Sequence, residues 1–274
     1  MKHMELQEYF SEVDRAYSEL TPPQMEQRFR ELLHAAETEH GGESGICAAM
    51  QSELGAFYRG QRRYTESEAS FMSALAILAK TVGKASPDYA TGLNNLAGTH
   101  RLMRKFDQAE AEFAEALALY RATLGTQHVL YASGLNNLSL LCLDRGDLAA
   151  AADYLKQSSE VLTALPECQD ELAASLCNLA TLDRNLGRAA EGAERVQRAI
   201  ELFEGPLGTA TPHYHAALSL LGLCRRDLGE LAAARDAFER AASAAKKLYG
   251  AQHREYQTIV TYLQCAEKEL EDRA

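Results

Sequence analysis

Apolar residues along the chain recur with the spacing of α-helices. Leu93 and Leu96, and later Leu135, Leu138 and Leu141, follow one another at three-residue steps. This spacing places the side chains on one face of a helix, whereas a half-buried strand would alternate apolar and polar positions. No segment of the sequence has a convincing strand pattern. The pattern therefore predicts an all-α protein.

The ends of the helices are marked as well. Glycine-containing tripeptides at 145–147, 186–188 and 228–230 interrupt the apolar pattern. Ser86-Pro87 and Thr211-Pro212 each place a hydroxyl before a proline, and this order favours a helix start because the hydroxyl caps free amides and proline fits the first turn. These boundaries predict paired helices of about seventeen residues each.

The sequence repeats itself with a period of 42 residues. One column of leucines keeps this spacing, with a single step of 41 residues: Leu54, Leu96, Leu138, Leu179, Leu221 and Leu263. A glycine column has the same period: Gly41, Gly83, Gly125, Gly208 and Gly250. The missing glycine falls at Pro166, in the repeat that is one residue short. Several columns in one phase indicate an array of supersecondary units.

Other columns contain only small residues, and a large residue accompanies them. The position after the repeating leucine is occupied by Gly55, Ala97, Ser139, Ala180 and Gly222. The large neighbours are Phe71, Phe113, Leu155, Val196 and Phe238. Small side chains at fixed points allow two helices to approach closely, and a bulky neighbour fills the remaining space. We therefore expect each repeat to be a helical hairpin.

This pattern divides the chain into three segments within one domain. Five hairpin repeats occupy residues 45–252, beginning near 45, 87, 128, 169 and 211. Residues 1–44 align with a degenerate hairpin, and residues 253–274 contain a helix that would cap the stack. No linker or low-complexity stretch interrupts the array. Because one hairpin cannot bury its own apolar face, stacking of neighbours must supply the core.

The repeating motifs resemble those of the tetratricopeptide repeat family. The residues that carry the resemblance are Asn-Asn-Leu-Ala (94–97), Asn-Asn-Leu-Ser (136–139), Leu-Gly-Thr-Gln-His (124–128) and Tyr-Gly-Ala-Gln-His (249–253). The 42-residue unit is similar to the variant found in kinesin light chains. The resemblance implies a right-handed superhelical solenoid whose first helices line a concave groove that binds other proteins.

Two columns depart from the family pattern. The aromatic of the first helix is kept at Tyr58, but its equivalents are His100, Cys142, Asp183 and Arg225. The glycine between the two helices is replaced by Arg62 and Arg104 in the first two repeats. A long heptad segment, expected of a kinesin light chain, does not precede the array. The resemblance therefore extends to the repeat type and not to that motor subunit.

A column of asparagines is the first candidate binding feature. The candidate residues, on the expected groove face, are Asn94, Asn95, Asn136, Asn137 and Asn178. An asparagine amide both donates and accepts hydrogen bonds, so a row of them suits the backbone of an extended peptide. The alternative is that these amides bond the adjacent repeat and hold the curvature.

A column of arginines is the second candidate. Five residues after the repeating leucine, four of five positions are arginine: Arg59, Arg101, Arg184 and Arg226. Guanidinium groups form two-pronged bonds with carboxylates, so this row would select an acidic peptide. The alternative is that the arginines are solvated or pair with residues such as Asp144 and Asp227.

Composition and charge narrow the function further. The formal net charge is -11, which disfavours general binding of nucleic acid because phosphates reward clustered cations. No run approaches the roughly 20 apolar residues that span a bilayer, and residues 1–30 show no secretory signal pattern. The six cysteines lack metal or redox spacing, which indicates reduced thiols. We therefore expect a cytoplasmic protein that does not bind membranes.

The sequence offers no enzyme or metal site. His213 and His215 lie two residues apart, and such residues do not face each other on a helix. His128 and His253 occupy the same repeat position just before a helix, where capping or packing is the expected role. There is no phosphate-binding loop or nucleophile motif. We expect no catalysis, no metal and no cofactor.

The interpretation that follows is an adaptor that binds a partner protein or peptide segment in its groove. A bacterial type of regulator, which senses a small peptide and then changes partner, is the alternative function. Self-association through the apolar residues of segment 4–20 is a third possibility, and the sequence leaves the oligomeric state open.

Overall fold

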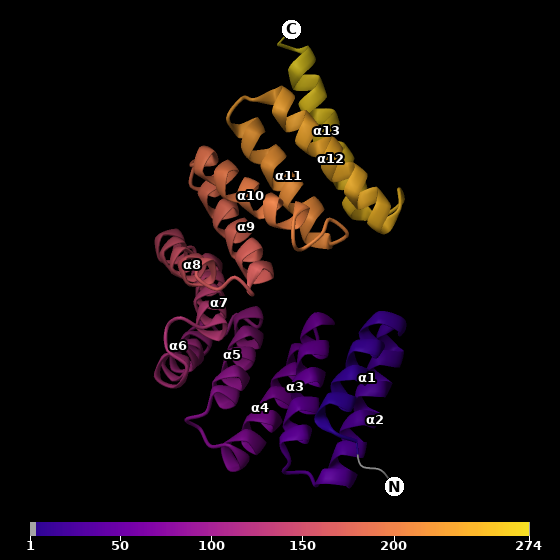
Figure 1. Ribbon diagram of the computed structural model, residues 1–274, viewed down its shortest axis with the longest axis vertical. Coiled ribbons are helices and arrows are strands. Elements are labelled where there is room, and N and C mark those ends of the chain that lie inside the picture. The colour runs from indigo at the N-terminus through magenta and orange to yellow at the C-terminus, as the bar shows by residue number, and fades with distance from the viewer. Residues whose placement is uncertain (1–3, 274) are drawn as a thin grey trace. The chain divides into compact units, whose positions relative to one another are not determined.

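The computed structural model describes residues 4–273, and these residues form thirteen helices and no strand (Figure 1). The first six helices are α1 (Leu6–Glu19), α2 (Pro22–His40), α3 (Gly45–Gly60), α4 (Tyr64–Thr81), α5 (Pro87–Leu102) and α6 (Phe106–Thr123). The others are α7 (Val129–Arg145), α8 (Leu148–Thr163), α9 (Gln169–Asn185), α10 (Ala189–Glu204), α11 (Pro212–Asp227), α12 (Leu231–Tyr249) and α13 (Arg254–Glu271).

The helices belong to two compact units. Unit 1 ends at Thr126 and unit 2 begins at Gln127. Unit 1 contains α1 to α6 and unit 2 contains α7 to α13. The further division of the chain into a degenerate hairpin, five repeats and a cap stays an interpretation of the sequence.

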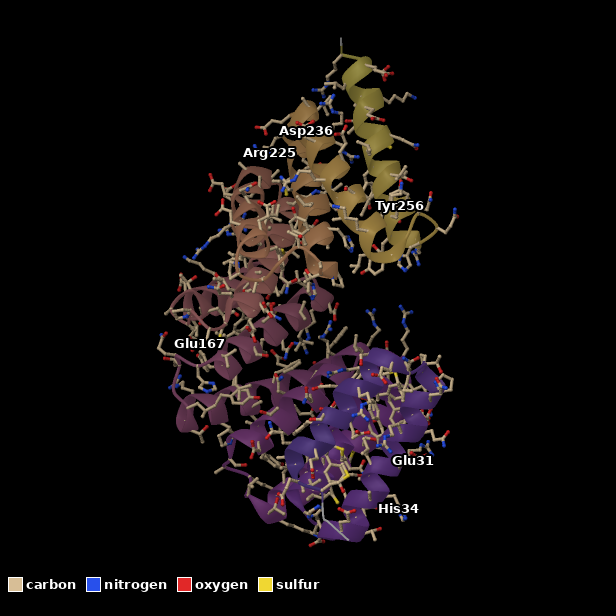
Figure 2. All side chains as sticks on the ribbon, turned by 45° about the vertical axis from the view of Figure 1, so that its right-hand side comes forward. Glu31, His34, Glu167, Arg225, Asp236 and Tyr256 are labelled. Carbon is tan, nitrogen blue, oxygen red and sulfur yellow. The ribbon has the colours of Figure 1, made fainter. Side chains whose placement is uncertain are left out.

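Within each unit, helices that are consecutive in sequence pack as hairpins that stack side by side. The hairpins are α3 with α4 and α5 with α6 in unit 1, and α7 with α8, α9 with α10 and α11 with α12 in unit 2. The first helices of neighbouring hairpins also touch, as α3 does with α5 and α9 with α11. The chain is therefore a tetratricopeptide-type solenoid of helical pairs, as the sequence predicts. Charged side chains such as Glu31, His34 and Asp236 project outward (Figure 2).

Helix starts are capped by the residue types that the sequence indicates. The hydroxyls of Ser44, Ser86 and Thr211 accept a hydrogen bond from an amide in the first turn. His128 and His253 use Nδ1 in the same way, accepting from the amides two residues later at 3.1 and 3.3 Å. The capping role expected for these two histidines is confirmed, since it satisfies amides that have no partner inside the helix.

The turn inside each hairpin of the array has one geometry. In all five turns, a residue with positive φ donates its amide to the carbonyl three residues earlier, and the next amide reaches back five residues. Gly146, Gly187 and Gly229 occupy the positive-φ position in unit 2, with φ between 77° and 83°. Arg62 and Arg104 adopt the same conformation in unit 1, with φ of 60° and 61°. This left-handed conformation costs a residue with a Cβ about 1–2 kcal/mol.

The columns of small residues mark the closest approach of the two helices. A Cβ atom added at Gly55 would lie 2.9 Å from Cε1 of Phe71, and one at Gly222 would lie 2.5 Å from Cε1 of Phe238. Both phenylalanines have no exposed surface. The phenyl rings thus occupy the volume that a side chain at the glycine would need, and each ring locks a first helix onto its second helix.

Removal of the backbone strain at Arg62 should stabilise unit 1. The Arg62 side chain is exposed, and glycine adopts positive φ without a steric penalty. We expect Arg62→Gly to raise the free energy of unfolding by about 0.5–1 kcal/mol, after the entropic cost of glycine is subtracted. Urea unfolding followed by circular dichroism measures the change. The reciprocal change Gly187→Arg, at a position with open space, should destabilise unit 2, and equal stability of both variants with wild type would contradict the assignment.

Addition of one methyl group at Gly222 should destabilise unit 2. A Cβ at this site overlaps the Phe238 ring, and overpacking of a core costs about 1–3 kcal/mol, which the better helix propensity of alanine offsets by about 1 kcal/mol. We expect Gly222→Ala to lower the free energy of unfolding by up to about 2 kcal/mol. The double variant Gly222→Ala/Phe238→Leu should recover part of the loss, and no recovery would show that the ring is not the obstacle.

Candidate functional site

The candidate residues lie on the first helices of the hairpins. Each unit has its own surface formed by these helices, which we call the first-helix face of that unit. It consists of α3 and α5 in unit 1, and of α7, α9 and α11 in unit 2. The neighbouring first helices touch within each unit, so each unit has a continuous face of this kind. All nine asparagines and arginines singled out from the sequence belong to these five helices.

The asparagines differ in what their side chains contact. Asn178 donates from Nδ2 to Oδ1 of Asn136 at 3.0 Å, which links α9 to α7. Asn95 is half-buried, and its side-chain amide has no hydrogen-bond partner among residues 4–273, whereas Asn94 is buried. Asn137 is half-buried. The structure thus brings one asparagine pair together, in agreement with the alternative that these amides bond an adjacent repeat.

Arg59 is held between two hairpins of unit 1. Its Nη1 donates to the backbone carbonyl of Asn95 at 3.1 Å, and its guanidinium lies 5.4 Å from the centre of the Phe71 ring. Burial lowers the pKa of Arg59, and the neighbouring charge of Arg101 lowers it further, while Tyr17 acts in the opposite direction. The proximity of two cations shows that the arginine column forms one line in this unit.

The two arginines of the column in unit 2 have different environments. Arg184 donates from Nε to Oδ2 of Asp227 at 2.6 Å, which joins α9 to the end of α11. Arg226 is half-buried and forms no side-chain hydrogen bond or ion pair within residues 4–273. Arg226 is therefore the member of this pair whose guanidinium is available to a ligand.

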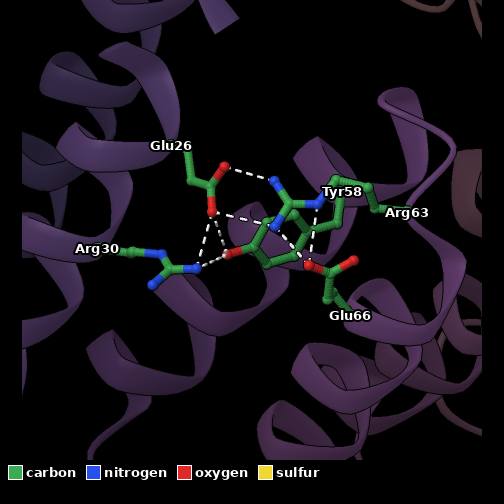
Figure 3. Close-up of polar contacts among 5 residues, drawn as sticks. All are labelled: Glu26, Arg30, Tyr58, Arg63 and Glu66. Atoms are coloured by element: carbon green, nitrogen blue, oxygen red, sulfur yellow. Dashed lines mark hydrogen bonds and ion pairs between the residues drawn. The ribbon is translucent and has the colours of Figure 1, made fainter. Parts of the chain in front are cut away.

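One column of the first helices carries polar contacts that the sequence did not reveal. Its residues are Tyr58, His100, Cys142, Asp183 and Arg225. In unit 1 the column residue contacts a glutamate of the preceding hairpin: Tyr58 donates to Glu26 at 3.2 Å, and His100 Nε2 lies 2.9 Å from Glu68. A cation from the turn after each first helix also pairs with the same glutamate. Arg63 pairs with Glu26, as Figure 3 shows, and Nζ of Lys105 lies 2.7 Å from Oε1 of Glu68.

Further charges complete the cluster around Glu26. Arg30 and Arg63 both pair with this carboxylate, and Glu66 pairs with Arg63 from the other side (Figure 3). The guanidinium of Arg63 also lies over the Tyr58 ring, 4.5 Å from its centre. The hydrogen bond from Arg63 is the main cause that lowers the pKa of Glu26. The cluster links α2, α3 and the start of α4, so its role is to hold neighbouring helices.

In unit 2 the same column pairs within its own hairpin. Asp183 is 1% exposed and pairs with Arg188 and Arg195, which both come from the start of α10 or the turn before it. Burial raises the pKa of Asp183, and the two arginines oppose this shift. Arg225 likewise pairs with Glu230 of its own turn.

The 32-residue spacing from Glu26 to Tyr58 and from Glu68 to His100 was the signal in the sequence that could have indicated the contacts between hairpins in unit 1.

The described residues offer no metal site, because no group of three histidine, cysteine or acidic side chains between residues 4 and 273 converges on one point. No helix in this part of the chain combines the length and apolar character needed to cross a bilayer. The six cysteines are unpaired thiols, and burial raises the pKa of Cys177 to about 12.

Comparison with solved structures shows the same fold. BtubC (BKLC) from P. vanneervenii shares 24% sequence identity with a TM-score of 0.62, over 74% of this chain and 81% of that one. A putative kinesin light chain from Podospora anserina, with nearly identical TPR-like repeats, shares 19% identity with a TM-score of 0.62, over 76% and 99% of the two chains. A Rap protein complexed with competence and sporulation factor shares 15% identity with a TM-score of 0.67, over 100% and 78%.

Comparison with protein families identifies the repeats. Two models, both described as tetratricopeptide repeat, match the chain at residues 46–121 and 88–164 and at residues 177–248. A search of curated proteins finds no match. The family matches cover more than half of the chain and coincide with the stacked hairpins, so the chain belongs to the tetratricopeptide repeat family, with repeats of the 42-residue kinesin-light-chain-like kind.

Proposed function

We propose that the protein is an adaptor that binds a segment of a partner protein on its first-helix face. Tetratricopeptide repeats are protein-interaction scaffolds, and this family is generally non-enzymatic. The observation that carries the proposal is that the first-helix face of each unit holds a half-buried polar group without an internal partner. These groups are the Asn95 amide in unit 1 and the Arg226 guanidinium in unit 2. Such groups retain hydrogen-bonding capacity that a ligand can satisfy.

An extended peptide suits the asparagines. In the bonded pair, Nδ2 of Asn136 and Oδ1 of Asn178 are not used by the bond between them. They therefore offer one donor and one acceptor side by side, the combination that a peptide backbone presents in return. The bond between the two amides fixes their orientation, which reduces the entropy lost when a ligand binds.

An acidic side chain in the partner suits the arginine column. The guanidinium of Arg226 can form a two-pronged bond with a carboxylate. Arg59 and Arg184 already have partners in the Asn95 carbonyl and Asp227. We therefore assign the selection of acidic residues first to Arg226. Arg184 aligns α9 with α11, the helix that presents Arg226, whereas Arg59 aligns α3 with α5 in unit 1.

The alternative is a switch that senses a small peptide. The Rap protein whose fold this chain shares was solved in complex with competence and sporulation factor, and a solenoid can change its partner when a ligand shifts the population of two conformations. The two candidates differ in a measurable way, because an adaptor retains a protein partner without any added ligand, whereas a switch gains or loses that partner when the ligand is added.

Loss of three of the four half-buried candidate asparagines, Asn95, Asn137 and Asn178, should weaken binding to a peptide backbone. We expect Asn95→Ala/Asn137→Ala/Asn178→Ala to weaken binding of a partner segment by roughly a hundredfold, at about 1 kcal/mol for each hydrogen bond. A pull-down from lysate of the source organism, with wild type and the triple variant side by side, identifies the partner. Fluorescence anisotropy with the isolated partner segment then measures the affinity. Thermal unfolding must first show that the variant is folded, and equal affinity of both proteins would exclude these amides from the site.

Removal of the Arg226 guanidinium should abolish the preference for acidic residues. We expect peptides selected by wild type from a random displayed library to be enriched in Asp and Glu, and Arg226→Ala to bind those peptides roughly ten- to a hundredfold more weakly. Arg225→Ala is the matched control, because Arg225 lies on the same helix but pairs with Glu230. Acid enrichment that persists in Arg226→Ala, or is lost equally in the control, contradicts the assignment.

A further inference from the structure

One buried histidine interrupts a column of alanines. Six residues before the repeating leucine, the first four repeats have an alanine that is at most 1% exposed: Ala48, Ala90, Ala132 and Ala173. The fifth repeat has His215, which is 5% exposed. A large polar ring thus occupies a site where the fold otherwise places a single methyl group.

The surroundings of His215 lie in the turn that leads to the last helix. The His215 ring meets the edge of the Tyr249 ring, with their centres 5.5 Å apart at an angle of 80°. Tyr249 stacks in turn on His253, at 4.4 Å and 20°. Tyr249 is the last residue of α12, and His253 is the N-cap of α13. His215 therefore packs against the turn from which α13 starts.

Neither ring nitrogen of His215 has a hydrogen-bond partner within residues 4–273. A neutral imidazole tolerates such a site at the cost of one buried donor and one buried acceptor. A protonated imidazole has two donors and a full charge, and burial of an unpaired charge is far more costly. The site thus discriminates strongly between the two protonation states.

We propose that His215 makes the docking of the C-terminal helix α13 sensitive to acid. In the neutral state the ring supports the α12–α13 turn through Tyr249 and His253. When the ring is protonated it must reach water, and the route to water displaces this turn. α13 then separates from α12, where it covers Phe238 with Tyr262 at a ring distance of 5.7 Å.

The environment of His215 favours its neutral form. Burial is the first cause that lowers the pKa of His215, and the neighbouring His213 and His253 lower it further. Glu255, in the first turn of α13, acts in the opposite direction. The residue that α12 places against the ring is Tyr249, which is uncharged at neutral pH. A carboxylate on α13 thus attracts the imidazolium, but it does not overcome the effect of burial.

The sign of the pH dependence follows from this lowered pKa. A histidine whose pKa is lower in the folded state contributes stability that is fully present above its unfolded pKa of about 6.5 and is lost as pH falls through that value. Between pH 7.5 and 5.5, the equilibrium constant for docking α13 should fall by up to about tenfold for one such group.

Hydrogen exchange of the α13 amides, expressed as protection factors so that the intrinsic pH dependence of exchange cancels, tests the proposal. The full chain is measured at pH 7.5 and 5.5 as wild type, His215→Leu, His215→Ala and His213→Ala. Leucine keeps the volume of the ring without its charge, and alanine restores the residue of the other four repeats. His213→Ala removes an exposed histidine of the same helix and is the matched control.

We expect protection of α13 to fall by up to about tenfold on acidification in wild type and in His213→Ala. The fall should be distinctly smaller in His215→Leu and His215→Ala. An undiminished fall in both His215 variants would overturn the proposal, as would unchanged protection in wild type. If one His215 variant fails to fold, the other carries the comparison.

Discussion

The structure depends on how closely the two helices of a hairpin approach each other. At Gly55 and Gly222 no side chain separates the helix backbone from a phenylalanine ring of the second helix. The ring fills the volume that a Cβ would occupy, and the pair is fully excluded from water. Because this contact sets the distance and angle of the two helices, it also sets how each first helix is presented to a ligand.

Polar contacts add selectivity to this apolar packing. A buried carboxylate such as Asp183 is stable only beside a cation, because an unpaired charge in the core is costly. Two arginines supply this pairing. The glycine–phenylalanine contacts are compatible with many neighbouring helices. The polar contacts require a neighbouring segment that carries the complementary group. The interior therefore specifies which helices meet, in addition to holding them together.

The sequence was sufficient to predict the fold because its signals are local and periodic. The glycine columns, the proline-marked helix starts and the capping histidines each act within a few residues, and the helix bounds follow them. The chemistry of the candidate face was also readable, since Asn and Arg are recognisable by type. Bonding between asparagines of adjacent repeats and pairing of an arginine with Asp227 were foreseen only as alternatives, because the Asn136–Asn178 and Arg184–Asp227 contacts join residues 42 and 43 positions apart. The role of His215 required the side chains around it to be known.

The polar contacts of His100 and Asp183 decide which hairpins can be moved into new repeat arrays. The hairpin of α5 and α6 carries His100, whose Nδ1 contacts Glu112 of the same hairpin and whose Nε2 contacts Glu68 of the hairpin before it. The hairpin of α9 and α10 contains both Asp183 and its two arginines. An engineer could move the hairpin of α9 and α10 into another solenoid without leaving a charge unpaired in the core, since its remaining polar links to neighbours are more exposed and cost less to lose. The hairpin of α5 and α6 would leave the buried Nε2 of His100 without a partner unless the new neighbour supplies a polar group at the position of Glu68.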